Sequence, residues 1–183
     1  MDQLERLCSD CLNDNVETLD MIRALLDESD LDASQLLELA CSQSDNPKLV
    51  AMLLNNPRVD PNYDSCACLM SAAEQGLYET VKLLLEDGRV DPNYDEAAAL
   101  DLAIESGHTD VARLLLADPR TDPSLNDNKA LFGAIHDCEY DMIRELARHP
   151  LVRASVDWSH MLGHAMETED SERIALVASL STL

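Results

Sequence analysis

A loop phrase recurs at a fixed spacing along this chain of 183 residues, and no other feature constrains its fold as strongly. The phrase reads PRVDPNYD from residue 57, GRVDPNYD from 88, PRTDPS from 119 and PLVRAS from 150, so successive copies start at equal intervals. A strict period of about 20 to 50 residues marks proteins built from stacked structural repeats. We therefore expect each copy to be the same loop between two units of an array.

Two apolar segments lie between successive copies of the phrase. In the first, Leu and Ala recur three residues apart, in the columns Leu69, Leu100, Leu131, Leu162 and Ala72, Ala103, Ala134, Ala165. This spacing forms one face of a short helix. The second segment reads TVKLLL, VARLLL or MIRELA, and Gly76 and Gly107 precede it where a positive φ ends a helix. Each unit is predicted to be a helix, a tight turn, a second helix and a polar loop.

The loop phrase has its own chemistry. Pro61, Pro92 and Pro123 fix φ and push the preceding aspartates into an extended conformation. Asn62 and Asn93 supply turn-forming side chains. The alternating Asp60, Asn62 and Asp64 also match the first ligands of an EF-hand calcium loop, but the required Gly and the bidentate Glu are absent. Asx turns explain these residues without a metal.

Charge and composition exclude several classes of function. With 36 acidic and 13 basic residues the formal charge is −23, which repels a phosphate backbone, so we expect no direct binding of nucleic acid. No apolar run reaches the roughly 18 residues that cross a bilayer, and the N-terminus has no signal-peptide pattern. Six cysteines are too few for a disulfide scaffold. We expect an intracellular protein, cytoplasmic or nuclear, without membrane association and monomeric.

The unit LLLEDGRVDPN followed by ALDLAIESGHTDVARLLL resembles the ankyrin repeat, best over residues 47–148. The resemblance implies an all-α solenoid of helix-turn-helix repeats, here with extended loops between repeats. Of the T-P-L-H signature only the leucine is kept, as in Ala67-Cys68-Leu69-Met70. The Thr and His that tie neighbouring units in this family are therefore missing. The DPN loop is also found in family members from protists, large viruses and intracellular bacteria, which implies a host-directed role as one alternative.

We expect one domain over residues 1–183, without a linker. Its six units would span residues 1–29, 30–60, 61–91, 92–122, 123–153 and 154–183, the outer two acting as caps. Residues 1–20 would form the first helix of the first unit, with an enlarged turn near Asn13 to Asn15.

Other candidate sites have a simpler structural interpretation. His160, His164 and Glu167 share one side of a helix as metal ligands do, but HMLGH lacks the Glu of a zinc protease. Cys8-x-x-Cys11 and Cys66-x-Cys68 complete no zinc pattern, so packing by small residues is favoured. No nucleophile motif or phosphate-binding glycine loop is present. We expect no enzyme, no catalytic residue, no metal and no cofactor.

In ankyrin-like proteins partners bind a concave surface made of turn tips and first helices. Carried over by column, this implies partner-binding residues at Tyr63, Asp64, Glu74, Gln75, Tyr94, Asp95, Asp101, Glu105, Ser106, Asn126 and Trp158. The same columns place Cys66, Ala97 and Asn128 at turn tips, and His136 and Asp137 at a helix end. Tyr63, Tyr94 and Trp158 are rings of the kind enriched at binding hot spots.

The carboxylates of this surface predict a partner with a basic surface or a Lys/Arg-rich segment. The function we expect is a non-catalytic protein-protein interaction module. The alternative is an acidic mimic of nucleic acid that inhibits a DNA- or RNA-binding protein. A mimic requires a continuous strip of carboxylates, whereas a recognition surface mixes them with aromatic residues. A third interpretation is that the acidity only maintains solubility.

Overall fold

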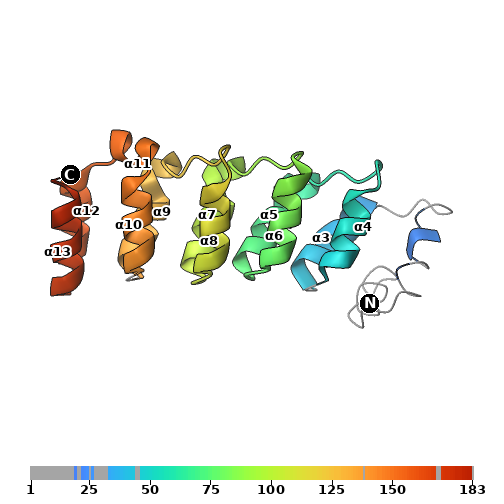
Figure 1. Cartoon of the computed structure of the whole chain (residues 1–183), viewed down its shortest axis with the longest axis horizontal. Coiled ribbons are helices and arrows are strands. Elements are labelled where there is room, and N and C mark those ends of the chain that lie inside the picture. The colour runs from blue at the N-terminus through green and yellow to red at the C-terminus, as the bar shows by residue number, and fades with distance from the viewer. Residues whose placement is uncertain are drawn as a thin grey trace.

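The computed structural model describes residues 19, 22–24, 26, 33–43, 46–137, 139–167 and 170–182. Among these residues the chain is helical and has no strand, and its helices follow one another in five pairs (Figure 1). The pairs are α3 (Ala33–Gln43) with α4 (Pro47–Leu54), α5 (Tyr63–Glu74) with α6 (Tyr78–Asp87), α7 (Tyr94–Glu105) with α8 (Thr109–Ala117), α9 (Leu125–His136) with α10 (Tyr140–Arg148), and α12 (Trp158–Met166) with α13 (Ser171–Leu180). The short α11 (Pro150–Ser155) precedes the last pair. The expected all-α repeat fold is confirmed.

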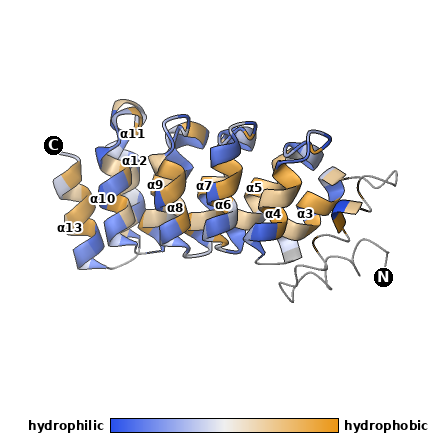
Figure 2. Cartoon of the chain, turned by 45° about the vertical axis from the view of Figure 1, so that its right-hand side comes forward, coloured by the Kyte–Doolittle hydropathy of each residue, from blue (hydrophilic) through white to orange (hydrophobic). Residues whose placement is uncertain are grey.

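The helical pairs stand side by side in one row, with the loops along one edge (Figure 1). Helix α5 contacts α3 and α7, while α6 contacts α4 and α8, so first helices stack on first helices and second helices on second helices. We call α3, α5, α7, α9 and α12 the first-helix layer, and α4, α6, α8, α10 and α13 the second-helix layer. Figure 2 shows that the loops at the upper edge are largely hydrophilic.

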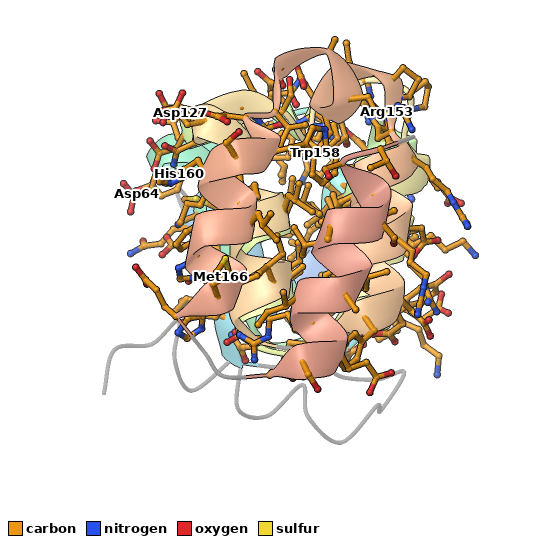
Figure 3. All side chains as sticks on the ribbon, turned by 90° about the vertical axis from the view of Figure 1, so that its left-hand side faces the viewer. Asp64, Asp127, Arg153, Trp158, His160 and Met166 are labelled. Atoms are coloured by element: carbon orange, nitrogen blue, oxygen red, sulfur yellow. The ribbon has the colours of Figure 1, made fainter. Side chains whose placement is uncertain are left out.

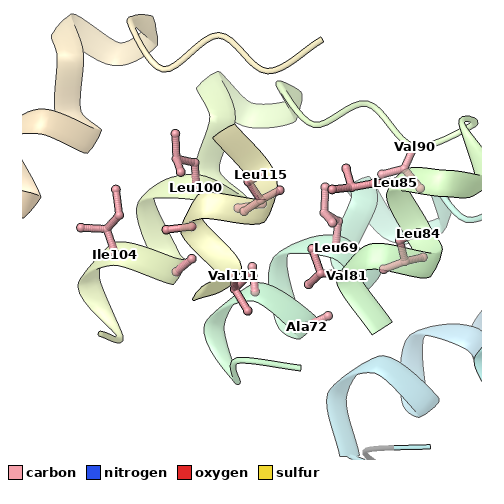
Figure 4. Packing of buried hydrophobic residues seen from close by; sticks show 14 of the residues in the cluster. Leu69, Ala72, Val81, Leu84, Leu85, Val90, Leu100, Ile104, Val111 and Leu115 are labelled. Carbon is pink, nitrogen blue, oxygen red and sulfur yellow. The ribbon is translucent and has the colours of Figure 1, made fainter. Parts of the chain in front are cut away.

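The repeated leucines and alanines build the core between the layers. Leu69, Leu100 and Leu131 are buried, as are the alanines three residues after them, whereas Leu162 of the last unit is only half-buried. Second-helix residues such as Val81 and Leu115 pack among them (Figure 4). Truncating one such leucine to alanine typically costs about 2 to 5 kcal/mol. The helical columns read from the sequence are therefore the columns that hold the units together.

Glycine follows the first helix in the turns after α5 and α7, as predicted. Gly76 has φ 71° and Gly107 has φ 75°. The amide of the residue after each glycine donates to the carbonyl five residues earlier. Leu77 N donates to Ala72 O at 2.9 Å, and His108 N donates to Ala103 O at 2.8 Å. These bonds close the helix ends. A Cβ on Gly76 would also meet the ring of His108 from the following unit.

The loops between units contain the predicted Asx turns. Oδ1 of Asp60, Asp91 and Asp122 accepts a hydrogen bond from the amide two residues later, at 2.9 Å in each case. The prolines between these residues are buried, and the residue before each aspartate is buried as well. The loop is thus packed down on the array at alternate residues while its aspartates turn the chain.

An arginine that precedes this turn links successive units. The Arg89 side chain donates from Nη1 to Val59 O at 2.7 Å and from Nη2 to Leu54 O at 2.9 Å. Its guanidinium also pairs with Asp87 at 2.6 Å and lowers the pKa of that carboxyl by hydrogen bonding. Arg120 occupies the same column of the next unit and likewise reaches Leu85 O and Val90 O at 3.0 Å.

Loop asparagines add a second link between the same units, with the side-chain amide of the earlier unit donating to the later one. Nδ2 of Asn62 donates to Arg89 O at 3.0 Å, and Nδ2 of Asn93 donates to Arg120 O at 2.7 Å. Oδ1 of Asn93 accepts from Asp122 N at 2.7 Å. Arginine and asparagine thus supply hydrogen bonds between units in a chain that lacks the Thr and His of the family signature.

A left-handed turn follows each of the three DP loops. Residues 95–97 have φ between 50° and 66°, and residues 126–128 have φ between 50° and 63°. In the corresponding turn at the start of α5, Asp64 has φ 45° and Cys66 has φ 58°. Asn and Asp tolerate this conformation, but Glu96 and Ala97 take it at a cost of about 1 to 2 kcal/mol each.

The fourth copy of the phrase is not the loop that its spacing predicts. PLVRAS forms α11, with Pro150 at its start and Val152 buried. The aspartate and proline of the other copies are here Arg153 and Ala154. Because no Asx turn forms and no proline forces the preceding residue out of the helical region, the segment stays helical.

Candidate functional site

Charge is divided unequally between the two layers of helices. The second-helix layer carries seven carboxylates and six cations, so its net charge is −1. The first-helix layer carries eight carboxylates and one cation, a net charge of −7. That cation is Lys129, and the carboxylates are Glu38, Asp64, Glu74, Asp95, Glu96, Asp101, Glu105 and Asp127. The acidity of these helices therefore lies in the layer that the sequence implicates in binding.

The predicted residues fall into two rows at opposite ends of the first helices. The loop-end row contains Tyr63, Asp64, Tyr94, Asp95, Asn126 and Trp158, and the turn-end row contains Glu74, Gln75, Glu105 and Ser106. A helix of 12 residues, such as α5, is about 18 Å long, which separates the rows. Asp64, Glu74, Asp95 and Glu105 are all exposed. The structure does not gather the eleven residues into one cluster.

Asp101 differs from the other acids of this layer because it is buried. Only 5% of it is exposed, and its Oδ2 lies 3.5 Å from Nζ of Lys129 on the next first helix. Burial raises its pKa to about 6 even though Lys129 opposes the shift. The same ammonium lies 3.1 Å from Glu105, which raises the pKa of Lys129. Asp101 therefore lies buried between α7 and α9 and is not an open contact for a partner.

The aromatic residues expected at the tips are not equally accessible. Tyr94 begins α7 and is 39% exposed. Tyr63 is half-buried and so is less accessible than Tyr94. Trp158 is also partly buried, because it packs against the core from the start of α12. Figure 3 shows Trp158 between the last two helices, whereas Asp64, Asp127 and His160 lie at the outer side of the first-helix layer.

Three of the residues expected at the tips face inward. Cys66, Ala97 and Asn128 are each at most 4% exposed. Each of them is a left-handed residue of the turn at the start of its first helix. Burial also raises the pKa of the Cys66 thiol. Gln75 is exposed as expected, but its Nε2 donates to Ser42 O of the preceding unit at 2.7 Å.

Sequence reasoning missed a stack of aromatic rings between α9 and α12. Phe132 stacks on His164 with centroids 3.9 Å apart and planes at 23°. His160 continues the stack on Phe132 at 6.4 Å, and His136 continues it on His164 at 6.1 Å. The sequence did contain a signal for this stack. Phe132 and His136 are four residues apart on α9, and His160 and His164 are four residues apart on α12, so each pair lies on one side of its helix.

Hollows surround this stack. One of about 440 Å³ lies between α9 and α12, lined by Asn126, Asp127, Asn128, Lys129, Phe132, Ser155, Asp157, His160 and Met161. Two more, of about 410 and 490 Å³, also border Phe132. Three hollows thus border the C-terminal part of the first-helix layer, where the ring stack replaces the small residues and carboxylates of α5 and α7.

Metal and membrane chemistry find no support in the described residues. Within them, no group of three or more His, Cys, Asp or Glu is placed to hold a metal ion, His160, His164 and Glu167 included. Cys66 and Cys68 are buried free thiols, as small-residue packing predicts, while Cys8 and Cys11 lie outside the described residues, as does most of the predicted first unit. No helix in the described part of the chain has the length and hydropathy of a membrane span.

Comparison with known proteins identifies the class. Residues 37–127 match the family model described as ankyrin repeats (3 copies). The matched segment runs from within α3 into the first turn of α9, where the helical pairs and the DP loops are most regular. The chain belongs to the ankyrin-repeat family. A search of curated proteins finds no match to the sequence. Ankyrin repeats are generally protein-protein interaction modules and are typically not enzymes.

Proposed function

We propose that this protein is a non-catalytic, intracellular interaction module that binds a basic partner protein on its first-helix layer. The observation that carries the proposal is the division of charge, with a net −7 on the first helices against −1 on the second. A surface of one sign steers an oppositely charged partner and fixes its orientation. Family membership supports a protein as the partner.

Specific contacts would come from the exposed members of the two rows. Asp64 and Asp95 at the loop end, and Glu74 and Glu105 at the turn end, occupy matching columns and so present the same charge in successive units. Tyr94 is the most accessible predicted aromatic contact. A Lys/Arg-rich segment lying along the row of first helices would meet these carboxylates in turn.

The alternative of a nucleic-acid mimic has weaker support. A mimic needs a continuous strip of carboxylates, but Lys129, Phe132 and the histidines interrupt them at α9 and α12. Asp101 is buried and therefore adds no carboxylate to the exposed surface. The mixed surface at this end therefore favours recognition of a protein.

The test compares two variants that lose the same charge from opposite layers. The first carries Asp64→Asn, Glu74→Gln, Asp95→Asn and Glu105→Gln, and the second carries Glu79→Gln, Glu86→Gln, Asp110→Asn and Glu172→Gln. All eight residues are exposed. Binding of a fluorescein-labelled Lys/Arg-rich peptide is measured by anisotropy at low and moderate salt. We expect the first variant to lose most of the affinity and the second to keep it.

Salt dependence is part of the same measurement. Affinity of the native chain should fall as ionic strength rises, because exposed charges are screened over about 8 to 10 Å at physiological salt. Equal losses in both variants would show attraction to net charge alone and would remove the first-helix layer from the proposal.

A further inference from the structure

The geometry points to an arginine-binding pocket between α9 and α12, in which a guanidinium from the partner lies against Phe132 and His160 and pairs with Asp127 and Asp157. The inference rests on the proposed function, since the arginine would belong to the basic partner. It assigns one side chain of that partner to one place on the first-helix layer. The pocket is the hollow of about 440 Å³ described above.

The ring stack supplies a surface suited to a planar cation. Phe132 and His160 lie with centroids 6.4 Å apart and planes at 19°, and both line the hollow. Phe132 is held by its closer contact with His164 at 3.9 Å. Guanidinium groups stack on aromatic faces within about 6 Å of the centroid, which a compact ammonium does less well. The stack therefore favours arginine over lysine.

Two carboxylates on the walls of the hollow supply the counter-charge. Asp127 is exposed on the first turn of α9. Asp157 caps α12, where its Oδ1 accepts from Ser159 N at 3.0 Å and from His160 N at 3.2 Å. These bonds hold the Asp157 side chain at the start of α12, where the residue lines the hollow together with Asp127 of α9. A cation that entered the hollow would therefore meet a carboxylate from each helix.

The cation already present in the lining does not oppose this assignment. Nζ of Lys129 lies 3.1 Å from Glu105 and 3.5 Å from Asp101, both on α7. Its charge is thus paired on the far side of α9 from α12. No other Lys or Arg lines the hollow in the described part of the chain. The net charge of the lining favours a cationic occupant.

The test uses the full chain and three small probes. Because the chain has a single phenylalanine, the ring signals of Phe132 report the pocket directly in a spectrum labelled at Phe and His. We titrate N-acetylarginine N-methylamide, the lysine analogue and the uncharged citrulline analogue. The expected result is saturable, millimolar shifts of the Phe132 and His160 rings with arginine, binding about fivefold weaker with lysine, and no saturable shift with citrulline.

Matched variants separate the pocket from the general acidity of the layer. Asp127→Asn should weaken arginine binding about fivefold. Glu96→Gln removes the same charge from the same column of the preceding unit and should leave binding unchanged. Phe132→Leu, followed through the His160 ring, should abolish saturation while the backbone spectrum shows an intact fold. Equal shifts with arginine and citrulline, equal affinity for lysine, or equal effects of Asp127→Asn and Glu96→Gln would overturn the assignment.

Failure of the pocket can be told from failure of the proposed function. If the Lys/Arg-rich peptide binds the first-helix layer but Asp127→Asn and Phe132→Leu leave its affinity intact, the pocket is wrong and the function stands. If arginine binds the pocket but neutralising the first-helix layer does not weaken peptide binding, the function is wrong and the pocket stands.

Discussion

The central junction between α7 and α9 and the C-terminal junction between α9 and α12 come from the same repeated template but end as different structures. In the central junction Arg120 clasps carbonyls of the unit before, Asp122 makes an Asx turn, and Asp101 pairs with Lys129. In the C-terminal junction Leu151 and Arg153 stand in the columns of that arginine and aspartate, α11 replaces the loop, and Phe132 stands in the column of Asp101.

The difference teaches that a few side chains decide whether the segment between two units forms an extended loop or a helix. Where arginine, aspartate and proline are present, the loop is extended and tied to its neighbour. Where they are replaced, the segment becomes helical, and the adjoining first helices border hollows lined by rings. The proposed pocket therefore lies where the array departs most from its own pattern, and the following changes test that contrast.

The largest effect is expected from Ala154→Pro, which puts the proline of the other loops into α11. A proline in a helix interior removes a hydrogen bond and clashes with the preceding turn, so we expect a loss of about 3 kcal/mol in the free energy of unfolding. Urea unfolding followed by circular dichroism measures it. A change below about 0.5 kcal/mol would show that α11 contributes little to the junction.

The second largest effect is expected from Arg120→Leu, which gives the central loop the leucine that the C-terminal segment has at the equivalent position, Leu151. Loss of the bonds to Leu85 O and Val90 O and of the pair with Asp118 should cost about 2 to 3 kcal/mol. Arg113→Leu is the control, because its pair with Glu145 is half exposed and its loss should leave the unfolding midpoint nearly unchanged. Similar unfolding midpoints for the two variants would contradict the role of the clasp.

A smaller effect with the opposite sign is expected from Asp101→Asn. The pKa of Asp101 is raised to about 6 by burial, so the folded state binds its proton more tightly than the unfolded state does. The stability that this proton contributes is full below the ordinary pKa of 3.8, is still largely present at pH 4, and is lost as the pH rises through about 6. The asparagine variant loses nothing over this window, so at pH 7 it should be more stable than the native chain by about 2 kcal/mol.

The measurement is thermal unfolding of both proteins at pH 4 and pH 7. The advantage of the variant should be confined to the higher pH. A variant less stable at pH 7 would show that the ion pair with Lys129 outweighs the burial of the carboxylate.

The smallest effect is expected from Glu96→Gly in the left-handed turn of α7. Glycine takes a φ of 59° without steric cost, so the variant should gain about 1 kcal/mol. Glu79→Gly lies in the exposed first turn of the right-handed α6 and should instead lose up to about 1 kcal/mol. Destabilisation by both changes, measured in urea, would rule out the left-handed turn at Glu96.

The fold and part of the candidate site were predictable from the residues. Leu69 and Ala72 recur in every later unit because their columns form the buried core of the array, so the period itself records the core. Gly76 and the DP loops were predictable because their conformations depend on adjacent residues. The exposed carboxylates at both ends of the first helices were also predictable, since they stand outside the apolar columns.

Other features depended on contacts between units. Arg89 is a repeated letter of the phrase, yet its reach to Leu54 and Val59 requires the folded loop. Asp101 reads as one more acid of the surface, and only the packing of α9 on α7 shows that it is buried. The stack of Phe132 with His160 and His164 joins residues about one unit apart.

Local rules thus dictate the array of helical pairs, because periodicity, turns and caps act over a few residues. Which side chains meet between neighbouring units depends on how far one pair is shifted and turned against the next, and no local rule sets that geometry. For this reason the charge of the first helices can be predicted from the sequence alone, whereas the burial of Asp101 and the pocket beside Phe132 arise only when the units are stacked.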